Sequence, residues 1–399
     1  MKETGALGIY IHIPFCRHKC DYCDFYSLAH SEEKMDAYTE ALVRHLEEVA
    51  PRCAAQAVDT VYFGGGTPSY LGEKRLIKLL KAVKKRYRMT PDAEITLECN
   101  PDSAQDKKAL KKLRRAGFNR LSLGVQAMDD GALRAVGRIH TVEQVRTSVE
   151  AIRAAGFQNL SLDLIYGLPG QTREQWRATL EAAAALAPEH LSCYGLKVEE
   201  GTPLWAKKDS LSLPDDDAQA DMYLFTVDYL ARQGYAQYEI SNFARPGCES
   251  RHNLRYWQLR EYAGFGPGAH SDMGGVRFAY ARDIDAYIAG EMRLSEREEI
   301  DPMDRDMETI MLSLRMSRGL DLADYGRRFR QKTQPLEALF REYEAHGLAQ
   351  PTESGWRLTP RGFLVSNSII AALQEAVTAV KRERMEAAAR GDYRVEHLL

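Results

Sequence analysis

The sequence predicts an α/β fold, a partial parallel (β/α) barrel followed by a small, mainly helical C-terminal domain. Most of the first 240 residues alternate short β-rich runs with stretches of helical spacing, and one helix-to-strand junction recurs. From about residue 300 the pattern becomes helical again. With 399 residues, 44% of them hydrophobic and 28% charged, the chain is long enough for one large globular domain and a smaller one.

Short β-rich runs predict the strands of the barrel. In chain order they are GIYIHI, DTVYFGG, EITLEC, RLSLGV, LSLDLIYG and HLSCYGL. Between the first two, hydrophobic residues three or four positions apart share one helix face, namely Met35, Tyr38, Leu42, Leu46 and Val49. We expect this helix to pack against the sheet.

A repeated junction supports successive helix-strand units. RRAGFNRLSLG at 114–124, RAAGFQNLSLD at 153–163 and RQGYAQYEIS at 232–241 each show a helix end, a glycine, an aromatic residue and a strand. Gly117, Gly156 and Gly234 suit the left-handed position after a helix. We favour a barrel because its strand ends would gather GGGTP, ECNP, GVQ and LDLIYGLP around one mouth.

The pattern changes after about residue 242. The segment SNFARPGCESRHNLRYWQLREYAGFGPGAHSDMGG is rich in Gly, Pro and polar residues, which indicates a long structured loop region. We therefore predict a barrel over 1–242, a loop-rich extension over 243–299, a small domain over 300–380 and a charged terminal helix or tail over 381–399.

Composition favours a cytoplasmic protein. The formal charge of −3 gives no reason to expect nucleic acid as a partner. No run approaches the ~18 apolar residues of a spanning helix, and the N-terminus lacks the pattern of a signal peptide. Seven cysteines, three of them crowded at one end, do not resemble a secreted disulfide framework.

Three cysteines stand close together in IPFCRHKCDYCDFYS, residues 13–27. The C-x3-C-x2-C spacing lets one loop turn the thiolates of Cys16, Cys20 and Cys23 toward a common centre. Thiolates hold iron–sulfur clusters, and a four-iron cluster with three of them leaves one iron open for chemistry. Zinc with His12 or His18 as fourth ligand, and unligated thiols, are the alternatives.

A glycine run, FGGGTPS at 63–69, follows the second predicted strand directly. Glycines let a backbone pass close to a ligand and present its N–H and C=O groups. On its own, such a run is more often only a turn.

With the cysteine loop, these motifs resemble the radical S-adenosylmethionine (SAM) superfamily. The resemblance implies that Cys16, Cys20 and Cys23 hold a [4Fe-4S] cluster whose fourth iron is chelated by SAM. It also implies reductive cleavage of SAM to a deoxyadenosyl radical. Further SAM contacts implied by the family pattern are Tyr10, Tyr22, Gly65, Gly66, Thr67, Glu98, Gln126, Arg138 and Asp163.

The pattern YIHIPFC, GGGTPS, LSLGVQ and DLIYGLPGQT resembles the oxygen-independent coproporphyrinogen III oxidase family over most of the chain. That enzyme carries an additional cysteine where this chain has Phe25. In RHNLRYW, the residues His252, Asn253, Tyr256 and Trp257 match the H-N-x-x-Y-W signature of the heme chaperone branch, HemW in bacteria. A histidine can ligate heme iron and aromatic residues offer a flat surface, although a hydrogen-bonded loop histidine is the commoner reading of such a segment.

These resemblances imply a radical-SAM-like protein that binds heme and delivers it to heme-accepting proteins. The rival hypothesis is an enzyme that decarboxylates coproporphyrinogen or acts on another tetrapyrrole. Peripheral contact with membrane-bound acceptors, a homodimer, and the roles of His270 and Cys248 stay open. The other cysteines lack a shared metal-ligand spacing.

Overall fold

The computed structural model describes residues 5–390, which divide into two compact units. The larger unit extends to Gln237 and includes Ser241–Ile300. The smaller unit contains Tyr238–Ile240 and the chain from Asp301 onward. No helix in the described part of the chain is long and apolar enough to cross a membrane.

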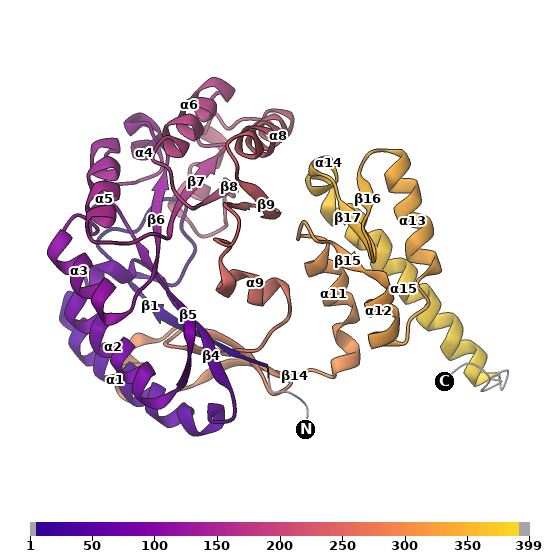
Figure 1. Ribbon diagram of the computed structural model, residues 1–399, viewed down its shortest axis with the longest axis horizontal. Coiled ribbons are helices and arrows are strands. Elements are labelled where there is room, and N and C mark those ends of the chain that lie inside the picture. Colours follow the sequence, from indigo (N-terminus) through magenta and orange to yellow (C-terminus); the bar gives the residue numbers. More distant parts are fainter. Residues whose placement is uncertain (1–4, 391–399) are drawn as a thin grey trace. The chain divides into compact units, whose positions relative to one another are not determined.

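A curved sheet with a parallel centre forms the larger unit (Figure 1). Its parallel strands lie in the order β11 (Tyr262–Phe265), β1 (Leu7–Ile13), β4 (Ala57–Gly65), β5 (Arg88–Cys99), β6 (Arg120–Gln126), β7 (Leu160–Tyr166) and β8 (His190–Gly195). Beyond β8, β10 (Asn242–Ala244) pairs antiparallel, and β9 (Ala236–Glu239) precedes it in the chain. The predicted parallel α/β fold is confirmed.

Helices cover the outer face of this curved sheet (Figure 1). They are α1 (Met35–Val49), α2 (Glu73–Arg86), α3 (Lys107–Ala116), α4 (Asp130–Ala135), α5 (Val142–Ala154), α6 (Arg173–Ala184) and α8 (Asp216–Arg232). Strand β1 shows how the sequence sets the two faces. Ile9, Ile11 and Ile13 join the hydrophobic core, whereas Tyr10 and His12, which alternate with them, line a cavity on the opposite face.

The predicted helix face and glycine junctions are confirmed. In α1, Met35, Tyr38, Leu42 and Leu46 are buried. Gly117, Gly156 and Gly234 all have positive φ angles, of 119°, 94° and 82°. The aromatic residue after each glycine is buried, as Phe118, Phe157 and Tyr235. Each junction therefore reverses the chain tightly and anchors the next strand in the core.

The segment after residue 242 is more regular than the sequence predicts. It contributes β11 to the parallel sheet and extends the sheet through β12 (His270–Met273), β13 (Val276–Tyr280) and β14 (Leu294–Glu299). It also contains α9 (Arg251–Trp257) and α10 (Ile284–Ile288). These strands are short and glycine turns lie among them, so the composition of the whole segment resembles that of a loop region.

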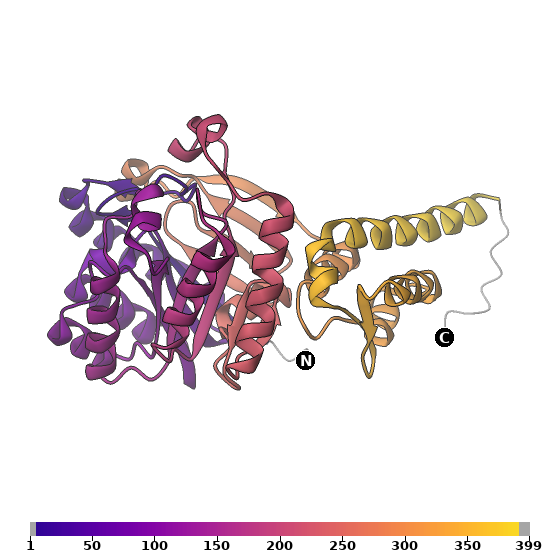
Figure 2. The same ribbon diagram turned by 90° about the horizontal axis from the view of Figure 1, so that it is seen from above.

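The smaller unit packs helices around a short hairpin sheet. Its elements are α11 (Asp306–Ser313), β15 (Leu320–Asp321), α12 (Leu322–Phe329), α13 (Gln334–Ala345), β16 (Ala349–Pro351), β17 (Gly355–Leu358), α14 (Pro360–Leu364) and α15 (Ser366–Ala389). Figure 2 shows α15 as the long yellow helix. Lys381, the residue at which a charged terminal helix or tail is predicted to start, lies inside α15, and 391–399 lie outside the described residues.

Candidate functional site

A cavity of about 400 Å³, here called the cysteine cavity, lies between the cysteine loop and the parallel strands. The structure brings most predicted site residues to its wall, namely Cys16, Cys20, Tyr22, Cys23, Gly65, Gly66, Thr67, Glu98, Gln126, Arg138, Asp163 and Asn253. Tyr10 and Tyr256 line a neighbouring cavity instead. His252 and Trp257 line neither of the two.

The glycine run lines the cavity, and its backbone also forms hydrogen bonds to the start of the cysteine loop. Gly66 N–H donates to the Ile13 carbonyl at 2.9 Å, and Thr67 N–H donates to the Phe15 carbonyl at 2.8 Å. A Cβ atom on Gly66 would lie 2.9 Å from the Phe15 oxygen and 3.0 Å from Cys16 Sγ. A side chain at position 66 would therefore displace the first cysteine.

The three thiols are free and have polar neighbours suited to a thiolate. Thr67 Oγ1 donates to Cys16 Sγ at 3.5 Å, and Arg138 Nη1 donates to Cys20 Sγ at 3.4 Å. Burial raises the pKa of the Cys16 thiol and raises that of Cys23 to about 11. A bound cation must therefore supply the charge that deprotonates them. Within residues 5–390, no three His, Cys, Asp or Glu side chains are gathered so as to hold a single metal ion.

Arg138 places a buried positive charge beside the cysteine loop. Its Nη2 donates to Asn100 Oδ1 at 3.1 Å and to the Gly124 carbonyl. A Cβ atom on Gly124 would lie 2.8 Å from Arg138 Nη2, so the glycine makes room for the guanidinium. Arg138 can therefore attract an anionic group into this side of the cavity.

Glu98, next to the last residue of β5, is hydrogen-bonded to strand β4 and the glycine run that begins there. Tyr62 Oη donates to Glu98 Oε1 at 2.7 Å, and Gly65 N–H donates to Oε2 at 3.2 Å. Burial, with a smaller contribution from the charge of Asp163, raises the carboxyl pKa to about 7. Glu98 is thus poised to change its charge near neutral pH when a cationic group binds.

Asp163 sits in a cradle of serine hydroxyls that sequence reasoning missed. Ser192, Ser122 and Ser161 donate to its carboxylate at 2.7, 2.9 and 3.2 Å. Burial raises the Asp163 pKa, and these hydrogen bonds oppose the rise. The available signal was the repeat of Leu-Ser before Leu or Cys in three strands, which puts each serine on the face opposite the leucines.

Gln126 has a backbone conformation that is strained for a residue other than glycine. It ends β6 with a φ of 66°, which is uncommon for a residue other than glycine. Its Nε2 lies 3.0 Å from the position of a Cβ on Gly124. The left-handed conformation directs the amide across the strand end into the cysteine cavity.

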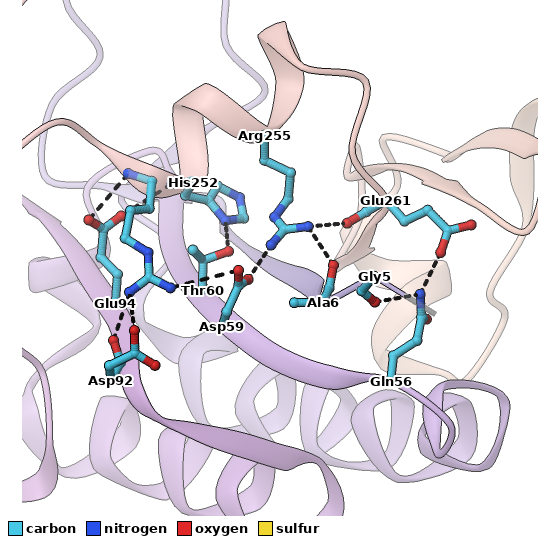
Figure 3. A network of polar contacts seen from close by, with 11 residues as sticks. Gly5, Ala6, Gln56, Asp59, Thr60, Asp92, Glu94, His252, Arg255 and Glu261 are labelled. Carbon is cyan, nitrogen blue, oxygen red and sulfur yellow. Dashed lines mark hydrogen bonds and ion pairs between the residues drawn. The ribbon is translucent and has the colours of Figure 1, made fainter. Parts of the chain in front are cut away.

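The H-N-x-x-Y-W segment forms helix α9, which is anchored on strands β4 and β5 (Figure 3). Glu94 accepts from the backbone N–H groups of Arg251 and His252 at the start of the helix. Arg255 is 1% exposed, donates to the Ala6 carbonyl at 2.8 Å and forms an ion pair with Asp59. The helix is thus fixed through buried charges.

His252 lies inside this network (Figure 3), and both of its ring nitrogens have hydrogen-bond partners. Nδ1 is 2.9 Å from Thr60 Oγ1, and Nε2 is 2.8 Å from the Tyr256 hydroxyl. The ring stacks on Tyr62 at 5.2 Å between centroids, and the residue is fully buried. Burial lowers its pKa to about 3, so the imidazole is neutral. In this conformation no ring nitrogen faces a space that could hold heme, and ligation by His252 stays a prediction that requires α9 to move.

Comparisons with known proteins identify the family of this chain. Residues 10–183 match the radical SAM superfamily, and residues 300–365 match the HemN C-terminal domain. The heme chaperone HemW of Bacillus subtilis is 36% identical over 91% of this chain and 98% of its own length. The heme chaperone HemW of Lactococcus lactis is 35% identical, over 90% of this chain and 95% of its own length.

The chain belongs to the HemW family of radical SAM proteins. Its fold is shared more widely. The crystal structure of coproporphyrinogen III oxidase (HemN) from Escherichia coli, a radical SAM enzyme, matches 92% of this chain and 90% of its own. That match has a TM-score of 0.79 and 26% sequence identity. The predicted fold and the predicted family are therefore confirmed.

One exposed side chain marks the cysteine loop of this HemW family member. Phe25, which replaces the additional cysteine expected in the oxidase, is 64% exposed and lines both cavities. Because the Phe25 side chain is a hydrocarbon, it adds no metal ligand to the cysteine loop. It offers an apolar edge to whatever enters the two cavities.

Proposed function

We propose that this chain binds a [4Fe-4S] cluster, SAM and heme, and transfers heme to acceptor proteins. The observation that carries the proposal is the convergence of three free thiols, the glycine run and the polar strand ends on one cavity. Similarity to proteins named heme chaperone over nearly their full length supports heme as the cargo.

In this proposal Cys16, Cys20 and Cys23 hold the cluster, and the strand ends hold SAM. The bound cluster and SAM supply one-electron chemistry. Arg138 would attract the SAM carboxylate, and the Glu98 carboxylate would accept hydrogen bonds from the SAM amino group. The buried carboxylate of Asp163 accepts from ribose hydroxyls, with the serine cradle holding its orientation. The remaining residues of the proposed SAM set are Tyr10, Tyr22, Gly65, Gly66, Thr67 and Gln126.

The cluster assignment is tested by iron–sulfur reconstitution of a cysteine variant and a matched control. Cys20→Ala should lose the cluster absorption band while keeping its far-UV circular dichroism. Cys248→Ala, whose thiol lies outside the cysteine cavity, should reconstitute like the natural protein. Stoichiometric zinc with no iron uptake in the natural protein would overturn the assignment.

Heme carriage is tested by an anaerobic heme titration of the cluster-reconstituted protein. Saturable binding near one heme per chain, followed by transfer to an apo-heme protein, is the expected result. The sequence nominates His252, Asn253, Tyr256 and Trp257 as heme contacts, so His252→Ala is included. Weak binding that does not saturate in the natural protein would refute the carrier function.

Catalysis on a tetrapyrrole is the second candidate, favoured by the structural match to HemN. Anaerobic incubation with coproporphyrinogen, SAM and a reductant distinguishes the two functions. Formation of more than one protoporphyrinogen per protein chain would show catalytic turnover and favour the enzyme over the carrier. Its absence, with heme binding intact, would favour the carrier.

The proposed partners are heme-accepting proteins, and the proposed location of this chain is the cytoplasm. Delivery to membrane-bound acceptors needs only a docking surface, and a homodimer is compatible with the proposal. Pull-down with apo-acceptors and sedimentation of the heme-loaded protein test these two points.

A further inference from the structure

A second cavity, here called the His270 cavity, lies beside the cysteine cavity. Its volume is about 380 Å³, and its wall includes Tyr10, Tyr26, Tyr256, Tyr262, His270 and Arg282. It shares Gly65 and Glu98 with the cysteine cavity, and Asp24 and Phe25 of the cysteine loop line both. A ligand in the His270 cavity would therefore touch the loop that carries the thiols.

Aromatic rings give this cavity flat apolar walls. Tyr256 and Tyr262 meet edge to face at 4.7 Å between centroids, and the Tyr26 ring stacks on His12 at 6.1 Å. Phe25 adds an exposed ring at the boundary of the two cavities. Such walls suit a planar conjugated ligand better than a flexible or strongly hydrated one.

His270 is the histidine of this region whose ring is available to a metal. His12 uses Nδ1 with the Tyr10 hydroxyl at 3.1 Å and Nε2 with the Tyr26 carbonyl at 2.9 Å. His252 likewise has both nitrogens occupied. The His270 side chain is exposed and makes no hydrogen bond with the residues that the structure describes. A neutral imidazole with an available nitrogen is a common ligand of heme iron.

Arg282 gives the same cavity a positive charge. Its side chain is exposed and forms no ion pair among residues 5–390. A Cβ atom on Gly268 would lie 3.5 Å from both Arg282 Cγ and Tyr26 Cβ, so the arginine stem lies next to an aromatic wall. A guanidinium at the rim of an aromatic cavity suits a planar ligand with carboxylates on its edge.

We propose that the His270 cavity is the heme site, with His270 as an iron ligand and Arg282 paired with a heme propionate. This inference rests on the proposed heme carriage and places its cargo away from His252. The cavity is too small to enclose a whole tetrapyrrole, so part of the heme stays exposed. A carrier needs this exposure because an acceptor must reach the cargo before it is released.

The test is an anaerobic heme titration of the full-length, cluster-reconstituted protein, read by Soret absorption. His270→Gly should weaken binding by more than about 100-fold, because even groups that only support a metal ligand contribute 10- to 100-fold. Added imidazole should restore both the affinity and the Soret position. Arg282→Gln should weaken binding by up to about fivefold, the effect of an exposed ion pair. His346→Gly, an exposed histidine of the smaller unit, is the control and should bind like the natural protein.

The outcomes separate this inference from the proposed function. Saturable binding in the natural protein that His270→Gly leaves unchanged would overturn the inference and keep heme carriage. Loss in His270→Gly with no rescue by imidazole would also overturn the assignment of His270 as the iron ligand. Failure of the natural protein to bind heme saturably would end both.

Discussion

Replacing Glu98 by glutamine should stabilise the folded protein while weakening SAM binding. The buried carboxyl has its pKa raised from 4.5 to about 7, chiefly by burial and partly by the charge of Asp163. At 1.36 kcal/mol per pKa unit, the charged form costs the folded state about 3 kcal/mol. The Glu98→Gln amide still accepts from Tyr62 but loses the Gly65 hydrogen bond, which costs about 1 kcal/mol. The net gain at pH 8 is therefore about 2 kcal/mol.

The sign depends on pH. Between pH 4.5 and about 7, the folded protein keeps the Glu98 proton and the unfolded chain has lost it. The unfolded state then binds fewer protons, so this group makes stability fall as pH rises through the window. The advantage of Glu98→Gln should be about 2 kcal/mol at pH 8 and should vanish or reverse near pH 4.5.

Urea unfolding at several pH values measures this difference, with tryptophan fluorescence as the signal. Trp176 is buried in the larger unit, so its environment changes when that unit unfolds. Glu150→Gln, at an exposed position on α5, is the control and should show a flat difference. SAM affinity of the reconstituted Glu98→Gln protein should fall by about tenfold or more, because a charge-assisted hydrogen bond is lost. An equal stability difference at pH 5 and pH 8 would refute the reasoning.

Three further substitutions and one control, Asp36→Asn, test the packing of the larger unit by urea unfolding. Asp59→Asn should cost about 3 kcal/mol because it leaves Arg255 buried without its ion-pair partner. Asp36→Asn, in an exposed ion pair, should change stability far less. Gly156→Ala should cost about 1 kcal/mol through backbone strain alone, since its φ is 94° and no atom lies within 4 Å of the new Cβ. Ser192→Ala should cost about 1–2 kcal/mol at neutral pH by removing the 2.7 Å hydrogen bond to Asp163, and equal stability of this variant would argue against the cradle.

Much of the parallel sheet and the cysteine cavity could be predicted because short-range patterns determine them. The alternation of Ile with Tyr and His in β1 sets which side chains face the core. Cys16, Cys20 and Cys23 lie within eight residues of one another, and Glu98 near the end of β5 and Asp163 within β7 face the same cavity of the parallel sheet. Local spacing and strand direction are both visible in a sequence.

The parts that could not be predicted depend on long-range contacts. The segment 243–299 reads as loop, yet β11 pairs with β1 across some 250 residues of sequence, a partnership that composition does not record. The state of His252 depends on Thr60, which is 192 positions away, and on Tyr256 one turn later. The residues that ring a histidine decide whether it is a ligand or a buried hydrogen-bond partner.

The position of His252 changes how its substitution must be interpreted. Its ring stacks on Tyr62, whose hydroxyl donates to Glu98, and Glu98 accepts from the backbone of the glycine run. His252→Ala therefore leaves a void under Tyr62 and loosens a wall shared by the two cavities. Loss of heme binding in this variant would follow either from removal of a ligand or from movement of Glu98. Rescue by added imidazole, with SAM affinity unchanged, would identify a ligand, whereas a joint loss of heme and SAM affinity would identify a structural support.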